Sequence, residues 1–468
     1  MIPNHHGLDL ASGSLVDHHL GQSGASAGIA DASRGPAANA SPVWTQLTLQ
    51  GTTPPGNYGE SVYDPAAGYT LFLDSQGSTW SYLTGRWSNI TASLDSSPPA
   101  RFSAVMVYDT QLEGVLLFGG LALGTADPLD DTWEFSGGQW HNLTSSLAES
   151  PPAAGEVIYD TAPISAAYDS HTNSVVLLDG PQTWVFNNSQ WSPVSTAISP
   201  GSRSVAGMAD DPADQDVVLF GGVNISTGSY VNDTWSFNGS DWTRLHPTFS
   251  PPAEGFVGFA YFPPGGYPLL AGGDNATGAV GGVWKFTAGS WEAIPSSSRP
   301  FAPLAALTFD AHDGYAFLIN QAMGGGNAFW VYGPPLGEPE VSISAVPTSG
   351  AVPLNVSFRP TVSGGQSPYI FSWVLRGEPI SREIGTSEDA NYTFNFSGTF
   401  EVYLTVTDVY GQHSSAFTNV TVLAVPTAPS FPSGWNTVEL AILTAAVLGT
   451  GILVAVVYWR VRGPSVER

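Results

Sequence analysis

Short segments in which apolar and polar residues alternate follow one another along most of this chain. In residues 101–144, Arg101–Asp109 alternates and ends in Tyr-Asp, and Gly114–Phe118 is an apolar run closed by two glycines. Asp131–Phe135 follows, and Gln139–Thr144 returns after a Gly-Gly turn. Alternation with period two, interrupted by glycine-rich turns, predicts four antiparallel β-strands in this unit.

The unit recurs, and its clearest mark is Thr-Trp-x-aromatic followed by a second tryptophan seven residues after the first. The six leading tryptophans are Trp80, Trp133, Trp184, Trp235, Trp284 and Trp330, which lie 53, 51, 51, 49 and 46 residues apart. A period near 50 residues predicts a propeller in which each repeat is one four-stranded blade. We expect the tryptophans to fill the gaps between blades; stacking of one or two on a sugar is the alternative.

These marks resemble the kelch repeat, in which an apolar strand ends in a double glycine and is followed by an aromatic strand and a spaced tryptophan. The resemblance covers roughly residues 43–333. It implies that the first domain, residues 41–335, is a six-bladed kelch-like β-propeller. Kelch-type oxidases hold copper with a cysteine-linked tyrosine, and this chain has no cysteine, so no cofactor is expected.

Both ends of the repeat region lack part of a blade. Trp44–Leu47 has the character of a fourth strand without a preceding blade. Phe329–Tyr332 has the character of a third strand, and Gly-Pro-Pro follows it in place of a fourth. The simplest solution pairs residues 43–48 with residues 328–332, which would close the ring of blades.

Beyond Pro339 the 50-residue rhythm stops, and residues 339–423 predict a small Ig-like β-sandwich. The segments around Pro347–Phe358, Tyr369–Trp373 and Gly398–Gly411 resemble a polycystic-kidney-disease (PKD) domain. The usual Trp-Asp-Phe-Gly-Asp-Gly is replaced here by Trp-Val-Leu-Arg-Gly-Glu. The resemblance implies an extracellular spacer or adhesion module.

The C-terminal end predicts a membrane anchor. Residues 424–437 have the composition of a linker, and Leu440–Trp459 is an uncharged stretch of 20 residues, which is long enough to cross a bilayer as a helix. We therefore predict a transmembrane helix over residues 438–459. Arginines follow at 460, 462 and 468, so the positive-inside rule predicts a cytoplasmic tail, residues 460–468, with residues 1–437 extracytoplasmic.

The fold class predicted from the sequence is therefore all-β: a six-bladed kelch-like propeller plus a small PKD-like sandwich, with one C-terminal transmembrane helix. Residues 1–40 are rich in Gly, Ala, Ser and His and are predicted to be a disordered tail without the apolar core of an export signal. Either the true start lies upstream, or the helix itself directs insertion. Paired histidines in this tail could bind a metal, but we assign no metal site.

Composition limits the function. Residues 1–437 carry 37 Asp and Glu against 10 Lys and Arg, and phosphate binding needs a basic surface, so no nucleic-acid partner is expected. The absence of cysteine excludes a disulfide framework, a thiol nucleophile and a thiolate metal site.

Asn-x-Ser/Thr occurs twelve times, which favours a glycosylated surface protein; the alternative is that turn-rich β chains use these residues together. We predict glycosylation at eight of these sites: Asn89, Asn142, Asn187, Asn238, Asn355, Asn391, Asn395 and Asn419. Asn224 and Asn275 fall in long loops of the candidate binding face, where we expect lower occupancy than at Asn89 and Asn142.

No catalytic constellation is evident. The histidines of the repeat region, His141, His171, His246 and His312, fall at different places in the repeat, so no three-histidine metal cluster is expected. The acidic pairs at 130–131 and 210–211 have the position of turn residues.

Strand parity indicates a candidate binding face. In an up-and-down blade, the loops between second and third strands, here 121–130, 223–231 and 274–281, emerge on the same side as the connections between blades. Arg101 and Arg203 begin innermost strands on this side and are our candidate ligand-binding residues. The alternative is that each arginine ties down its own loop through backbone hydrogen bonds.

Taken together, the sequence predicts a membrane-anchored cell-surface protein whose head binds or adheres to glycans or other surface proteins. The alternatives are an extracytoplasmic carbohydrate-active enzyme with its site at the propeller channel, and a structural envelope component. Clustered carboxylates in a deep central pocket would favour the enzyme, whereas a loop-rich face with exposed aromatic residues would favour binding.

Overall fold

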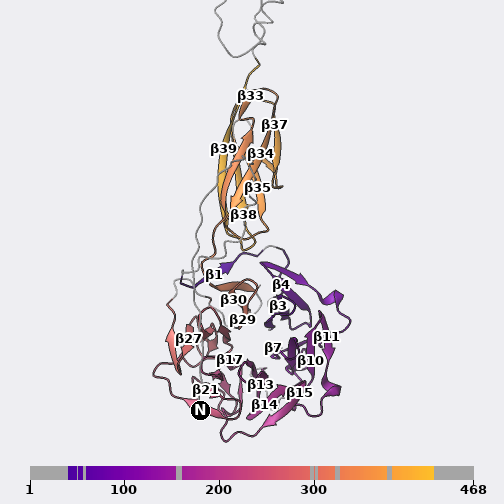
Figure 1. The fold of residues 1–468 in the computed structure, drawn as a ribbon, viewed down its shortest axis with the longest axis vertical. Coiled ribbons are helices and arrows are strands. Elements are labelled where there is room, and N and C mark those ends of the chain that lie inside the picture. The colour runs from indigo at the N-terminus through magenta and orange to yellow at the C-terminus, as the bar shows by residue number, and fades with distance from the viewer. Residues whose placement is uncertain are drawn as a thin grey trace, which may run out of the picture.

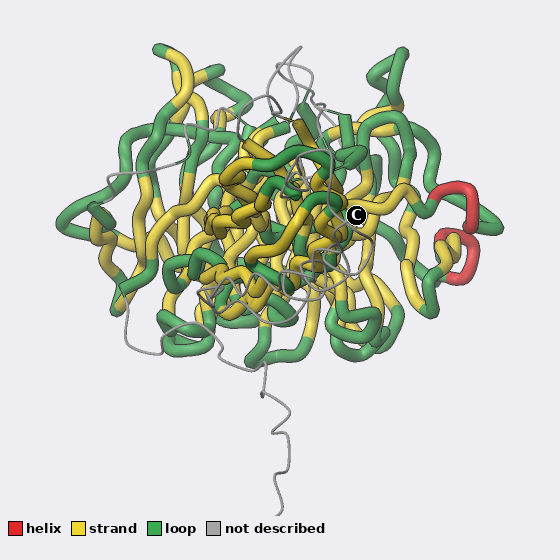
Figure 2. Tube along the Cα trace, turned by 90° about the horizontal axis from the view of Figure 1, so that it is seen from above, coloured by secondary structure: helices red, strands yellow, loops and turns green. Residues whose placement is uncertain are grey.

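The described chain is built almost entirely of β-strands (Figure 1). The computed structural model describes residues 41–49, 51–55, 59–153, 161–295, 300, 304–321, 327–376 and 382–425. The helical elements among these residues are two 3₁₀ turns, η1 (Thr91–Ser93) and η2 (Thr144–Ser146), which lie at the outer edge in Figure 2.

Six four-stranded antiparallel sheets, called here repeat sheets 1 to 6, follow the repeats of the sequence. Sheets 1 to 3 comprise β2 (Glu60–Asp64), β3 (Tyr69–Leu73), β4 (Thr79–Leu83) and β5 (Arg86–Asn89); β7 (Val105–Asp109), β8 (Gly114–Phe118), β10 (Thr132–Ser136) and β11 (Gln139–Asn142); and β12 (Ile164–Asp169), β13 (Ser174–Asp179), β14 (Gln182–Asn187) and β15 (Gln190–Val194). Sheets 4 to 6 comprise β17 (Gly207–Asp211), β18 (Asp216–Phe220), β21 (Thr234–Phe237) and β22 (Trp242–Leu245); β23 (Gly258–Phe262), β24 (Tyr267–Ala271), β27 (Val283–Thr287) and β28 (Ser290–Ala293); and β29 (Ala305–Asp310), β30 (Tyr315–Asn320), β31 (Ala328–Gly333) and β1 (Val43–Leu47).

The N-terminal strand completes the last repeat sheet. β1 pairs antiparallel with β31, and Trp44 lies opposite Tyr332. This register is the one in which Trp140 lies opposite Phe135 in repeat sheet 2. Trp44 is thus the second tryptophan that the sixth repeat lacks in its own sequence. The predicted pairing of residues 43–48 with residues 328–332 is confirmed.

Burial explains why the second strand of each repeat is a continuous apolar run. Every residue of β8 is buried, and Val217–Phe220 of β18 are buried in the same way. These strands are covered on both faces because one face packs on the preceding sheet and the other on the following sheet. The first strands contact one another in the order β2, β7, β12, β17, β23 and β29, and Figure 1 shows them nearest the centre.

Neighbouring repeat sheets are linked by one recurring side-chain hydrogen bond. The indole Nε1 of the fourth-strand tryptophan donates to the hydroxyl of the threonine that precedes the leading tryptophan of the previous repeat. The four pairs are Trp140 to Thr79 at 3.0 Å, Trp191 to Thr132 at 3.1 Å, Trp242 to Thr183 at 2.8 Å and Trp291 to Thr234 at 2.9 Å.

This hydrogen bond is missing where the fifth and sixth repeats should supply the threonine. Val283 and Phe329 occupy the threonine position in repeat sheets 5 and 6. The Nε1 atoms of Trp44 and Trp87, which would donate to those positions, are buried and have no partner among the described atoms. The repeat motif therefore has a threonine at this position because its hydroxyl accepts a hydrogen bond from the tryptophan of the next sheet.

The C-terminal residues form two sheets that share one core. One sheet has the order β32 (Glu340–Val346), β34 (Leu354–Ser363) and β37 (Ala390–Phe394). The other has the order β33 (Ser349–Ala351), β39 (His413–Leu423), β38 (Gly398–Thr407), β35 (Ile370–Arg376) and β36 (Arg382–Gly385). Apolar side chains alternate inward from both sheets around Trp373, which is fully buried. The boundaries of this domain and its likeness to a PKD domain stay predictions.

A short turn of the C-terminal sheets packs against the repeat sheets. Val409 and Tyr410 are buried in the same cluster as Trp87 and Phe329. The amide of Thr48 donates to the carbonyl of Tyr410 at 3.3 Å. At Gly85, which has φ +73°, a Cβ would lie 2.6 Å from the Val409 side chain, so only glycine permits this close approach.

The predicted fold class needs correction as a whole. No helix in the described ranges is long and apolar enough to span a membrane. Residues 438–459, on which the transmembrane helix was predicted, lie outside the described residues, as do residues 1–40 and 460–468. The described strands pair as eleven separate sheets, which are not closed into the propeller that the repeat predicts. What holds is an all-β chain of antiparallel sheets.

The tryptophan–threonine link gives a first prediction. Thr234→Val removes the acceptor of Trp291 and leaves its indole N–H buried without a partner, so the free energy of unfolding should fall by about 1–3 kcal/mol. Val283→Thr is the reverse change and should raise stability by about 0.5–1.5 kcal/mol by giving Trp44 an acceptor. Denaturant unfolding measures both. An unchanged stability for Thr234→Val would contradict the link.

A second prediction concerns β1. A chain that begins at residue 49 loses the buried Trp44 and Leu47 and leaves the edge of β31 unpaired, so its melting temperature should fall sharply. A chain that begins at residue 41 keeps every contact of β1 and should melt as the full chain does. Calorimetry compares the two, and equal melting temperatures would refute a structural role for β1.

Candidate functional site

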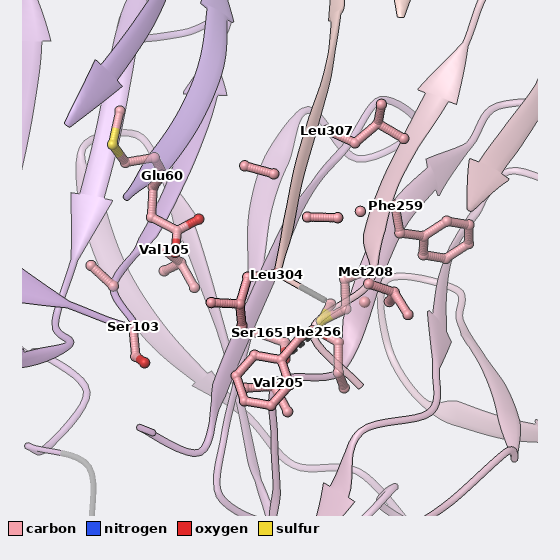
Figure 3. A pocket seen from close by; sticks show the side chains of 18 of the residues that line it. Glu60, Ser103, Val105, Ser165, Val205, Met208, Phe256, Phe259, Leu304 and Leu307 are labelled. Atoms are coloured by element: carbon pink, nitrogen blue, oxygen red, sulfur yellow. Dashed lines mark hydrogen bonds between the residues drawn. The ribbon is translucent and has the colours of Figure 1, made fainter. Parts of the chain in front are cut away.

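A cavity of about 230 Å³ lies among the first strands of the repeat sheets (Figure 3). Each of the six sheets contributes residues from the start of its first strand or from the turn before it. The start of the first strand follows the connection between sheets, so the cavity lies toward the face that carries those connections. Many of its lining residues, Met106 and Met208 among them, have apolar side chains, but polar atoms make up most of the surface that faces the cavity.

One position in the wall differs from its five equivalents. The strand registers align the residues that lie opposite Leu73, Phe118, Leu178, Phe220, Ala271 and Ile319. The aligned residues of repeat sheets 1 to 6 are Glu60, Val105, Ser165, Gly207, Gly258 and Ala306. A carboxylate thus stands where the other sheets have a small uncharged side chain.

Glu60 is the one ionisable residue among the described residues that line the cavity. Its side chain lies among the labelled wall residues of Figure 3, and no ion pair joins it to a described lysine or arginine. Burial away from bulk water raises the pKa of Glu60 to about 8. The neighbouring Gly59 is held by Gln321, whose side chain accepts from its N–H at 2.6 Å and donates to its carbonyl at 2.7 Å.

The predicted ligand-binding arginines are not among the residues that line the cavity, and most of their donors are engaged. Arg101 is 2% exposed, makes a bidentate pair with Asp131 at 2.6 and 2.7 Å, and also donates to the Gly119 carbonyl. Arg203 repeats this arrangement with Asp233 and Gly221. These contacts are those of an arginine that ties down its own loop, and a ligand contact stays a prediction.

The arginine strands also anchor the long loops. β6 (Arg101–Phe102) pairs with β9 (Leu121–Ala122), and β16 (Arg203–Ser204) pairs with β19 (Val223–Asn224), which continues to β20 (Ser229–Tyr230). In repeat sheet 5 the corresponding loop forms β25 (Asp274–Asn275) and β26 (Gly278–Ala279). The loops between second and third strands are thus fixed at one face.

Repeat sheet 5 has the opposite charge at the arginine position. Glu254 occupies it, and Gly282 occupies the position of Asp131 and Asp233. Glu254 is fully buried, and neither carboxylate oxygen has a partner among the described atoms. Burial raises the pKa of Glu254 to about 8. The Nε1 of Trp284 lacks the aspartate partner that Trp133 and Trp235 have.

The predicted acid pairs and sequons are structural where the chain is described. Asp131 is held by Arg101, and Asp210 accepts the Ser170 N–H, so neither pair forms a pair of free carboxylates. Asn89 and Asn142 are exposed and accept the N–H of Thr91 and Thr144, which begins η1 and η2. Glycosylation at these sites stays a prediction, as it does at Asn187, Asn238, Asn355, Asn391, Asn395 and Asn419.

A cluster of metal-ligating side chains is absent from the part of the chain that the structure describes. No group of three His, Cys, Asp or Glu residues is placed there to hold an ion. The tail histidines at 5–6 and 18–19 lie outside the described residues.

Apolar side chains are exposed in the loops of the cavity face. Leu123 is 41% exposed, Ile198 50% and Phe249 69%. Leu123 follows β9, and the other two lie in the connections between sheets 3 and 4 and between sheets 4 and 5. This face therefore offers apolar contacts around the cavity end of the repeat sheets.

Sequence reasoning did not single out Glu60 or Glu254. Both residues differ from their equivalents in the other repeats, and they can be found by aligning the six repeats with one another. Aligning the six first strands by their second-strand partners exposes a glutamate against Val, Ser, Gly, Gly and Ala at one position. The same alignment exposes a glutamate against two arginines at the other.

No protein-family model matches this sequence, and no curated protein matches it. Among solved structures, the chain is similar to the extracellular domain of a hybrid two-component system protein from B. thetaiotaomicron, with a TM-score of 0.35 and 10% identity. The match covers 81% of this chain. The chain spans 59% of the length of that structure.

Glu254 gives a prediction about pH. The fold favours its protonated form, so stability is highest below the ordinary pKa of 4.5, falls as pH rises, and reaches its lower limit above the folded pKa of about 8. Glu254→Gln cannot ionise. Its melting temperature relative to the natural chain should therefore rise by at least about 2 °C between pH 5 and pH 9.

Glu149→Gln, which removes an exposed carboxylate, is the matched control and should show no such trend. A difference between Glu254→Gln and the natural chain that stays constant with pH would contradict the burial of an ionisable group at this position.

Proposed function

We propose that this chain is an extracytoplasmic recognition protein that binds a glycan at the central cavity. The observation that carries the proposal is that the described residues of the cavity wall include one carboxylate, Glu60, together with the hydroxyl-bearing Ser61, Ser103 and Ser165. Hydroxyl and carboxylate groups are suitable partners for sugar hydroxyls, which both donate and accept hydrogen bonds. The extracytoplasmic location rests on the acidic composition and the abundance of sequons.

The carbohydrate-active enzyme is the weaker candidate. Glycoside hydrolysis ordinarily requires two carboxyl groups, about 5–9.5 Å apart, one on each side of the scissile bond. Among the described residues that line the cavity, Glu60 has no second carboxylate to work with. The described residues of the wall can position a ligand, and the pair of carboxyl groups that cleavage would use is not found among them.

A second candidate is the binding of another surface protein. It is favoured by the exposed Leu123, Ile198 and Phe249, because interface anchors are commonly apolar or aromatic side chains. In this case the loops would make the contact, and the cavity would not be needed.

A glycan array probed with the full chain tests the first proposal. We expect a restricted set of sugars to bind, and Ser103→Ala to weaken that binding about tenfold, as expected for the loss of about 1.4 kcal/mol of hydrogen bonding. Phe249→Ala is the matched variant on the loops and should leave glycan binding unchanged.

Three outcomes would count against the proposal. Binding lost in Phe249→Ala but retained in Ser103→Ala would transfer the site from the cavity to the loops. The release of shortened sugars would favour the enzyme. A chain that binds no glycan would favour the second candidate.

A further inference from the structure

The charge at the cavity narrows the class of ligand. The five positions equivalent to Glu60 carry Val, Ser, Gly, Gly and Ala, so the fold does not require a carboxylate there. A half-buried carboxylate without a cationic partner is costly to the folded chain. Its presence at one position of six is accounted for if it meets a cation that the described residues do not supply.

No described basic side chain takes that role. Lys285 pairs with Glu292, and Arg101 and Arg203 pair with Asp131 and Asp233. None of these three basic residues belongs to the cavity wall. The carboxylate is therefore open to the cavity, and the excess of acidic residues in the chain repels anions and attracts cations.

The rest of the wall limits the shape of the cation. Met106, Met208, Leu304 and Leu307 contribute apolar side chains to the wall, while polar atoms make up most of the surface that faces the cavity. No group of three His, Cys, Asp or Glu residues is placed among the described residues to hold a metal ion, which makes a metal the less suitable cation. The volume of about 230 Å³ is below the ~300–1,000 Å³ of drug-sized ligand sites, which favours a small molecule. A primary ammonium group has three N–H donors, so it can meet the carboxylate and neighbouring polar atoms together, while the small body that carries it packs on the apolar side chains.

We propose that the central cavity binds a small primary amine, with its ammonium group donating to the Glu60 carboxylate. The body that carries the amine is either an amino sugar or a short alkyl chain. This inference rests on the proposed function, because it assumes that the cavity is the binding site, and it names the charge that the ligand must have.

Binding should release a proton at neutral pH. Without ligand, the carboxyl of Glu60 is mostly protonated at pH 7 because its pKa is about 8, and it must ionise to meet an ammonium group. Affinity should therefore rise as pH increases from 6 to 8. The residues that face Glu60 from the other first strands at this level are Val105, Ser165, Gly207, Gly258 and Ala306, none of which titrates.

Calorimetric titration of the full chain tests the inference, with n-propylammonium, glucosamine and its neutral N-acetyl derivative as probes. We expect at least one of the two amines to bind. Any amine that binds should do so at least tenfold more tightly than N-acetylglucosamine. Titrations in two buffers with different heats of ionisation should show that binding releases a proton at pH 7. Preference between the two amines identifies the sugar or the alkyl body.

Glu60→Gln should lower amine affinity tenfold or more and abolish proton release. Glu149→Gln, which removes an exposed carboxylate and the same unit of charge, should change neither. Amine binding that is equal in Glu60→Gln and the natural chain would overturn the inference. If Glu60→Gln does not fold, the absence of proton release in the natural chain would overturn it instead.

Failure of the inference can be separated from failure of the proposed function. Neutral glycans that bind at the cavity, with no preference for amines, would leave the recognition function standing and remove the charge requirement. A chain that binds neither amines nor neutral glycans would count against both.

Discussion

The hydrogen bond from a tryptophan of one repeat to a threonine of the repeat before it is the contact on which the arrangement of the repeat sheets depends. Strand hydrogen bonds hold each sheet together but do not join one sheet to the next. The faces that meet are apolar and would tolerate sliding. Four indole N–H groups, each with one acceptor on the neighbouring sheet, fix how the faces meet. Where Val283 and Phe329 replace the threonine, other hydrogen bonds join the sheets: the hydroxyls of Tyr267 and Tyr332 link sheets 5 and 6, and Gln321 and Gly59 link sheets 6 and 1.

Most of the strands could be predicted from the sequence, because the same pattern occurs in six copies of the repeat. Each strand was recognisable from its alternation or its apolar run, and the incomplete ends predicted that Trp44 would pair beside Tyr332. The relation between sheets depends on contacts that no local pattern encodes, and the predicted closed propeller was wrong for that reason. The transmembrane helix was predicted on residues 438–459, which lie outside the described residues.

The candidate site was much less accessible, for a physical reason. A repeat is recognised by what its copies share, whereas Glu60 and Glu254 are departures from it. Arg101 and Arg203 were chosen as candidates because basic residues are rare in this chain. In the structure each of them pairs with an aspartate and holds a loop in place, which is a structural role. A residue type can be rare in a chain and still be unavailable to a ligand, because its side chain is buried and already paired.

The direction in which the cavity points has a consequence for access. Figure 1 shows the repeat sheets arranged around a common centre in the plane of the page, with the C-terminal sheets extending within that plane. The cavity lies among the first strands of these sheets. The line through the centre of the repeat sheets thus runs across the long axis of the molecule. A ligand of the central cavity must therefore approach from the flank of the molecule, and not along its long axis from the end that the C-terminal sheets occupy.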